Sequence, residues 1–307
     1  MPVAGNHALG SVALVTTILC FGTLWTCAKL SLDYLPPLWF TAVRFGIGGL
    51  FIATVLWVQG RLAIPDRADI PIILSVGGIM FGVYSSIFQC ALEFIHAGRA
   101  TVLGYTTAIF VTPIAILFLG ERLNRVTLLG LVSALVGFLL LFNPGELDWS
   151  NKKLVFGNAM LLACVILWSG VIIHLRVHRR VTDTLALVPW YLLVAFIVAA
   201  TAAIIYEGSP VFEVGITGWA IFLYAGVVCS GIGNWGVTTA IMNLPATTST
   251  IGLLGVPVLA LVISVAFLGE ILTWSLLFGL VLIIFGIVAV TFSQRPEKRK
   301  LERENAL

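Results

Sequence analysis

Charged side chains are scarce in this sequence. Lys, Arg, Asp and Glu make up 10% of the 307 residues and hydrophobic residues 60%, whereas a soluble domain carries about 25% charged residues. The mean hydropathy is correspondingly high, at +1.08. These values predict a membrane protein whose apolar surface faces lipid. The formal net charge of +3 is too small for the basic surface that a nucleic-acid partner requires.

Patterns that indicate a metal, a cofactor or a catalytic site are also missing. The five cysteines lie in apolar runs without a C-x-x-C or Cys/His spacing, which predicts free buried thiols. His174 and His178 have the i, i+4 spacing of metal ligands, but Arg176, Arg179 and Arg180 beside them would repel a cation. No Ser/His or Cys/His pair is evident, because every histidine lies near a predicted membrane edge. We therefore expect no metal, no cofactor and no enzymatic activity.

Two further features are missing: an acidic residue within an apolar run, and a secretion signal. No Asp or Glu lies in the middle of an apolar run, which argues against a proton relay through a buried carboxylate. No Lys or Arg precedes the first apolar run and no A-x-A site follows it, so a cleaved signal peptide is not expected.

The apolar residues fall into ten runs, and a helix that crosses a bilayer needs about 20 such residues. The runs lack a period of two and are too long for strands, so they predict helices rather than a membrane barrel. Proline and glycine separate them, as at Pro36-Pro37 and Gly145. The runs cover approximately 9–30, 36–58, 70–92, 97–119, 124–142, 154–174, 183–206, 215–240, 246–268 and 273–293.

Lys and Arg are distributed unevenly between the two ends of these runs. If the N-terminus is cytoplasmic, twelve of the seventeen basic residues fall on the cytoplasmic side and five on the other. The positive-inside rule then predicts that both termini are cytoplasmic. The charged segment 294–307 is expected to be a solvated cytoplasmic tail.

An internal repeat organises the chain. Residues 91–121 return without a gap as residues 240–270, with eight of 31 positions identical, and the offset of 149 also pairs Gly130 with Gly279 and Gly137 with Gly286. Each repeat holds five predicted helices, and five is odd, so the second repeat must enter the membrane from the opposite side. We therefore predict two inverted repeats, residues 1–145 and 146–293, an architecture that many secondary transporters share.

Polar and aromatic side chains inside the runs are the candidate substrate-binding residues. At mid-depth their O–H, N–H or amide groups need partners, and a mixed aromatic and amide lining suits a small amphipathic solute. Interhelical packing is the ordinary alternative for any one of them. The candidates are Trp25, Tyr84, Gln89, Tyr105, Trp168, Asn234 and Trp235.

Three other charged positions need an explanation. Arg44 lies eight residues into the second predicted helix, where an unpaired cation is costly, so it has either a structural partner or a place in a cavity. In a cavity it would be a substrate-binding residue that takes a carboxylate. Glu121 and Glu270 follow Leu-Gly at the turn into the next helix. A carboxylate there can accept from free backbone N–H groups, so we interpret both as structural turn residues.

Several of these segments together resemble the drug/metabolite transporter superfamily and, within it, the EamA family. The resemblance covers residues 9–293 as two repeats. It rests on Trp25 in FGTLWTCAKL, Arg44 in TAVRFGIGG, AGRATVLGYTTAIF and LGERL in the first half. In the second half the matching pieces are Trp168 in VILWSG, PATTSTIGLLGVPV and LGE. The family usually has proline where this chain has Ala108, and the second repeat keeps it as Pro257.

This resemblance implies a ten-helix bundle around a central cavity in the bacterial inner membrane, and export of small metabolites, often amino acids. In aromatic amino-acid exporters of the superfamily, residues that correspond to Trp25, Tyr105 and Trp168 line the cavity. A permease for anionic or phosphorylated metabolites that uses Lys29, Arg44 and Arg99 remains an alternative. An intramembrane enzyme and a channel are less well supported, because neither a catalytic pair nor a filter motif is present. A monomer is compatible with the sequence.

Overall fold

The computed structural model describes residues 7–106, 110, 125–142, 150–178, 180–209, 214–244 and 252–293. Every regular element in these residues is helical, and each of the ten predicted runs contains a helix, so the predicted all-α membrane fold is confirmed. Six of the helices in the described residues are long and apolar enough to cross a membrane. Glu121, Ala108 and the tail 294–307 lie outside the described residues.

The first half of the chain contains five helical segments in the described residues. The helix that covers the third run is continuous but changes from α-helix to π-helix and back. The segments are α1 (His7–Leu30) with the short turn η1 (Ser31–Asp33), α2 (Pro37–Val58), the turn η2 (Arg67–Asp69) leading into α3 (Ile70–Ile73), η3 (Leu74–Val83) and α4 (Tyr84–Ala91), then α5 (Ala97–Gly104) and α7 (Arg125–Phe142).

The second half repeats this order, including the change to π-helix in its third segment. Pro257, which matches the proline expected in the family, lies in the first turn of α13, where a missing N–H is tolerated. The segments are α8 (Lys152–Val177), α9 (Thr184–Tyr206), α10 (Gly215–Leu223) with η4 (Tyr224–Ile232) and α11 (Gly233–Asn243), α13 (Gly255–Leu268) and α14 (Trp274–Ser293).

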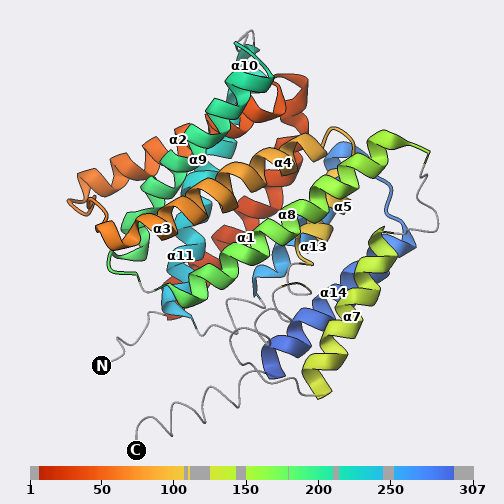
Figure 1. The fold of residues 1–307 in the computed structure, drawn as a ribbon. Helices are drawn as coiled ribbons and strands as arrows, with labels where there is room; N and C mark the ends of the chain where they lie inside the picture. The colour runs from red at the N-terminus through yellow and green to blue at the C-terminus, as the bar shows by residue number, and fades with distance from the viewer. Residues whose placement is uncertain are drawn as a thin grey trace, which may run out of the picture.

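Helices α2 and α9, the second helix of each repeat, pack antiparallel and exchange equivalent contacts (Figure 1). At one end, the Trp39 indole of α2 donates to the Gly208 carbonyl after α9, at 2.9 Å. At the other end, the Trp190 indole of α9 donates to the Ala63 carbonyl after α2, at 3.0 Å. The two hydrogen bonds are related by an approximate two-fold axis, as the inverted repeat requires.

The fifth helices, α7 and α14, form a second antiparallel pair at one edge of the bundle (Figure 1). Glycine allows the close approach, because a Cβ at Gly137 would meet the Gly279 carbonyl oxygen at 2.7 Å and one at Gly286 would meet that of Gly130 at 2.5 Å. These four residues are the ones that the 149-residue offset pairs. The Ser133 hydroxyl donates to the Leu282 carbonyl across the same interface, at 3.0 Å.

The first helix of each repeat packs against the opposite repeat. Helix α1 contacts α11, η4 and α13, and helix α8 contacts α4, η3 and α5. Each π-helical segment also packs on the second helix of the other half, η3 on α9 and η4 on α2. The two halves are therefore interlocked, and the centre of the molecule is built from helices of both.

Candidate functional site

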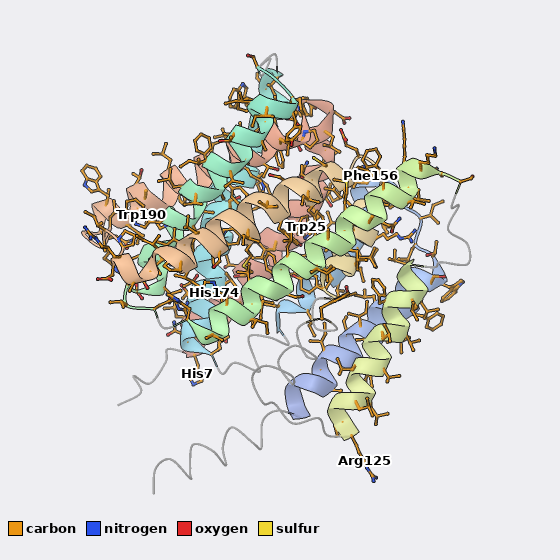
Figure 2. All side chains as sticks on the ribbon, viewed as in Figure 1. His7, Trp25, Arg125, Phe156, His174 and Trp190 are labelled. Carbon is orange, nitrogen blue, oxygen red and sulfur yellow. The ribbon has the colours of Figure 1, made fainter. Side chains whose placement is uncertain are left out.

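A line of four aromatic rings crosses the centre of the described bundle. Trp25 of α1 lies 4.2 Å from Phe88, Phe88 lies 5.6 Å from Tyr84, and Tyr84 lies 4.7 Å from Trp168 of α8, all as distances between ring centroids. Phe88 and Tyr84 are one helical turn apart on α4, so they present their rings on one face. Figure 2 shows Trp25 among the central helices, with His7 and Arg125 at the periphery.

The line joins the two repeats. Trp25 and Trp168 lie in the first helix of the first and second repeat, respectively. Both pack against the same buried cluster, with residues of α4 between them. The Trp25 indole nitrogen is buried and has no hydrogen-bond partner among the described residues. An unpaired buried donor is unfavourable by about 1–3 kcal/mol. The indole therefore offers a hydrogen bond to an acceptor that enters this part of the molecule.

Tyr105 belongs to the same part of the bundle. It follows α5 as the residue that ends the helix, is partly buried and packs against the cluster that contains Trp25 and Trp168. A Cβ at the preceding Gly104 would lie 3.5 Å from the Tyr84 hydroxyl oxygen, so the end of α5 lies beside the aromatic line. The structure thus gathers Trp25, Tyr84, Tyr105 and Trp168, although the central cavity around them stays a prediction.

Arg44 lies inside α2 and is almost fully buried, with 7% of the residue exposed. Its Nη1 donates to the Ser230 hydroxyl of η4, at 3.2 Å, and its guanidinium lies 4.0 Å from the centre of the Phe45 ring. Helix α2, which carries Arg44, contacts α4, which carries Tyr84 and Phe88. Within the described residues no carboxylate forms an ion pair with Arg44.

Gln89 and Lys29 instead join the C-terminal end of α1 to the C-terminal end of α4. The Gln89 amide donates to the Ala28 carbonyl at 2.6 Å and to the Ser31 hydroxyl at 3.2 Å. Lys29 donates to the Leu92 carbonyl. The Gln89 amide thus donates to two acceptors of the protein, and the Lys29 ammonium group is bonded to a carbonyl at the end of α4.

Asn234 and Trp235 lie on α11, which packs on α1. The Asn234 amide donates to the carbonyl of Ser230 one turn earlier, at 2.7 Å, which supports the helix that carries the Arg44 partner. Trp235 packs against two other buried clusters, one around Phe45 and one around Leu14. Substrate contact by either residue stays a prediction.

Two carboxylates each accept hydrogen bonds from the first turn of a helix in the other half of the chain. Glu270 after α13 accepts from the Ala97 and Gly98 N–H groups of α5, at 2.7 and 3.0 Å. Glu207 after α9 accepts from the N–H groups of Leu38 and Trp39 in α2, at 2.8 and 3.0 Å. Burial raises the pKa of the Glu207 carboxyl, and these two donors offset part of that rise. The contacts of Glu270 are those expected of a structural turn residue.

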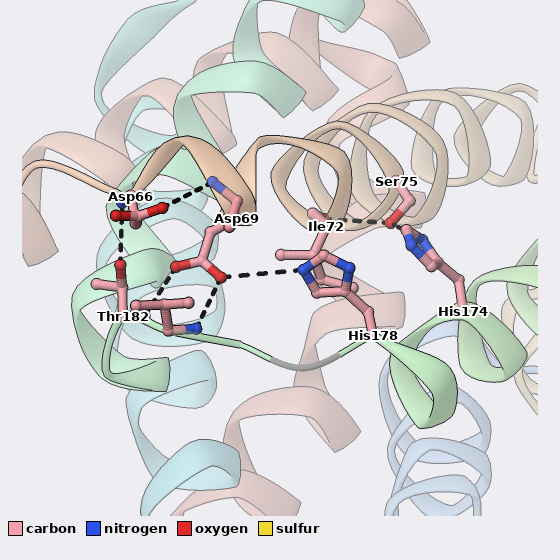
Figure 3. Close-up of polar contacts among 9 residues, drawn as sticks. Asp66, Asp69, Ile72, Ser75, His174, His178 and Thr182 are labelled. Carbon is pink, nitrogen blue, oxygen red and sulfur yellow. Dashed lines mark hydrogen bonds and ion pairs between the residues drawn. The ribbon is translucent and has the colours of Figure 1, made fainter.

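A third carboxylate, Asp69, lies in a polar cluster at the end of the bundle near η2 (Figure 3). Asp69 is fully buried and accepts from the Val181 and Thr182 N–H groups before α9, at 3.0 and 2.7 Å. His178 Nε2 lies 3.9 Å from its Oδ1, and His174 bonds with the Ser75 hydroxyl at 2.8 Å. The two histidines thus tie α8 to the third helix. No group of three or more His, Cys, Asp or Glu in the described residues could hold a metal.

Sequence reasoning missed two residues of this site, Phe88 and Ser230. Phe88 connects Trp25 to Tyr84, and its i, i+4 spacing from Tyr84 was a signal that could have identified it. Ser230 receives the Arg44 hydrogen bond, and its only sequence signal is a small polar residue within the apolar segment VVCSGIG.

Comparison with known proteins gives a consistent result. The model of the EamA-like transporter family matches residues 8–143 and 155–292. The uncharacterized transporter YoaV of Bacillus subtilis is 26% identical over 92% of this chain and 96% of its own length. A probable amino-acid metabolite efflux pump of Salmonella typhimurium is 27% identical over 94% of this chain and 96% of its own. A crystal structure with 23% identity, covering 92% of this chain and 98% of its own, has a TM-score of 0.68 and shows the same fold.

Proposed function

Because this chain belongs to the EamA-like transporter family, we propose that it exports amino acids, aromatic or other neutral ones, by alternating access. The observation that carries the proposal is the line of rings from Trp25 to Trp168. Rings contributed by both repeats can hold the apolar part of a solute at the interface where the repeats meet. The name of the Salmonella relative agrees with this substrate class.

We place the protein in the bacterial inner membrane with both termini in the cytoplasm, and we divide the repeats between residues 145 and 146. On alternating access, the helices around 70–119 and 215–268 move against those around 9–58 and 154–206. Among the described contacts that cross between these groups, two sets lie at opposite ends of the bundle. They are the hydrogen bonds of Asp69 with the segment before α9 and those of Gln89 with the end of α1.

A permease for anionic or phosphorylated metabolites is the second candidate, and the surroundings of Lys29 argue against it. The Lys29 ammonium group already donates to the Leu92 carbonyl at the end of α4. A phosphate dianion needs several cations that are not already balanced. Arg99, the third cation of this hypothesis, is only partly buried, whereas Arg44 is buried without a carboxylate partner in the described residues.

Transport by purified protein in proteoliposomes tests the proposal. Vesicles loaded with one unlabelled amino acid at a time should accumulate the same labelled amino acid by counterflow if it is a substrate. A carrier shows this trans-stimulation and a channel does not. A panel of neutral and aromatic amino acids, with sugar phosphates as the comparison set, identifies the substrate class. Counterflow with sugar phosphates alone would contradict amino-acid export.

A further inference from the structure

Arg44 is a buried cation whose charge is not neutralised within the described residues. Its described partners are one serine hydroxyl and the face of one ring. A guanidinium carries five N–H donors, and this hydroxyl uses one of them. Insertion scales give about 2.5–3.5 kcal/mol for an Arg near the centre of a membrane helix, so an uncompensated one is rare without a function.

The chain also builds a specific support for this guanidinium. Ser230 lies in the π-helical segment η4, where its hydroxyl donates to the Ala225 carbonyl five residues earlier, at 2.9 Å. With its hydrogen used in this way, the oxygen is available to accept from Arg44 Nη1. Glycine brings the two helices together, because a Cβ at Gly226 would meet the Arg44 carbonyl oxygen at 3.2 Å. Ser230 therefore orients Arg44 rather than neutralising it.

We propose that Arg44, oriented by Ser230, binds the carboxylate of the substrate, while the aromatic line holds its apolar part. The inference rests on the proposed export of amino acids and narrows it, because it makes a carboxylate a requirement. A planar guanidinium can form two parallel hydrogen bonds with a carboxylate. The unpaired indole N–H of Trp25 is a further donor, at one end of the aromatic line.

The charge of the site selects the class of anion. The single guanidinium of Arg44 balances one carboxylate. A neutral amino acid carries one carboxylate and one ammonium group, so the amino acid itself has no net charge. Removing the carboxylate from the solute leaves an amine, which Arg44 repels. Amines of the same shape should therefore be excluded, and the carboxylic acids without the amino group should still bind.

Equilibrium binding to the full chain in lipid nanodiscs tests this with matched probes. The probes are L-phenylalanine, phenethylamine and 3-phenylpropanoate, together with L-leucine and isoamylamine. Wild-type protein should bind the carboxylate-bearing probes and discriminate against both amines by roughly 10- to 100-fold, the range of a hydrogen-bonded ion pair. Arg44→Gln should remove this discrimination.

Variants at Ser230 separate positioning from simple packing. Ser230→Ala should weaken carboxylate binding by roughly 3- to 10-fold and leave amine binding unchanged, and Ser230→Thr should restore it. Ser133→Ala is the matched control, because it removes a helix-interface hydroxyl in the α7–α14 pair and should change neither. Arg61→Gln controls for the loss of an arginine, since Arg61 is exposed and pairs with Asp183.

Three outcomes are distinguishable. Equal binding of amino acids and their amines by wild-type protein overturns the carboxylate subsite and leaves amino-acid export standing. Failure of both amino acids to bind or to be exported overturns the proposed function and the subsite with it. If Arg44→Gln does not fold, the discrimination between amino acid and amine by wild-type protein, and its reduction in Ser230→Ala, still decide the question.

Discussion

At the scale of single residues, Trp168 in the aromatic line and Tyr105 beside it are expected to contribute differently to substrate binding. Trp168→Ala removes a whole ring that contacts Tyr84, whereas Tyr105→Phe removes only a hydroxyl. We expect Trp168→Ala to lower export by roughly tenfold or more and Tyr105→Phe by a few-fold, because losing stacking area weakens binding more than losing one hydrogen bond. Counterflow normalised to folded protein measures both. Trp57→Ala, at an exposed tryptophan, is the control and should be without effect.

Accessibility gives an independent test of Tyr105. A Tyr105→Cys variant in a background without the five native cysteines should react with a water-soluble maleimide, and substrate should protect it. A thiol that stays unlabelled in a protein that still exports would assign Tyr105 to packing.

Asp69 is expected to stabilise the fold rather than to bind substrate. Asp69→Asn replaces one oxygen acceptor by an amide donor that faces the Val181 or Thr182 N–H group. The free energy of unfolding should fall by about 1–3 kcal/mol, as for a buried donor left unpaired. Thermal unfolding in detergent measures this. Asp66→Asn is the matched control, because Asp66 is exposed and accepts from the single N–H group of Ala68, and it should cost less.

At the level of residues, the sequence indicates a chemical need more readily than the partner that meets it. The need of Arg44 for a partner followed from its charge at membrane depth, but Ser230 could not be named, because the π-helix that positions it has no signature in the sequence. Asp69 precedes an apolar run, so the sequence placed it at an edge. The structure buries it because the segment before α9, which is distant in sequence, folds over it.

At the scale of helices, Glu270 connects two repeat-equivalent helices, because it follows α13 and caps α5. Glu270→Gln keeps an acceptor for one of the two N–H groups but loses the charge that favours the N-terminal end of a helix. We expect a lower folded yield and a loss of about 1–3 kcal/mol of unfolding free energy, with transport per folded molecule nearly unchanged. Loss of transport at normal yield and normal melting would instead place Glu270 in the coupling mechanism.

Helices were predictable from sequence to the extent that lipid imposes their length and polarity. Each apolar run contains a described helix, and Pro36-Pro37 marks the start of α2 as expected. The π-helical segments η3 and η4 were not predictable, because no residue pattern in the sequence marks them; both pack on the second helix of the other half. Glycines in both let the backbone of a neighbouring helix approach closely, as where a Cβ at Gly77 would meet the Tyr191 carbonyl oxygen at 2.7 Å.

At the scale of the whole molecule, the orientation in the membrane stays a prediction. Reporter fusions after residues 66 and 180 and at the C-terminus should report a cytoplasmic location, and a fusion after residue 208 a periplasmic one. The physical reason is the excess of Lys and Arg on one side of the predicted helices. A periplasmic reporter signal from the C-terminus would contradict this orientation.

The inverted arrangement was predictable because five helices per repeat is an odd number. How the halves pack was not, since the sequence does not show that α1 lies on α11 and α13 or that α8 lies on α4. For the same reason the sequence could suggest Trp25 and Trp168 as equivalents without showing that Phe88 and Tyr84 stand between them.

The reciprocal indole contacts of Trp39 and Trp190 also bear on what half of the chain can do alone. Each contact joins one half to the other, and neither forms within a half. A half expressed by itself would therefore lack the acceptor for its indole, and pairing with a five-helix unit inserted in the opposite direction would restore it.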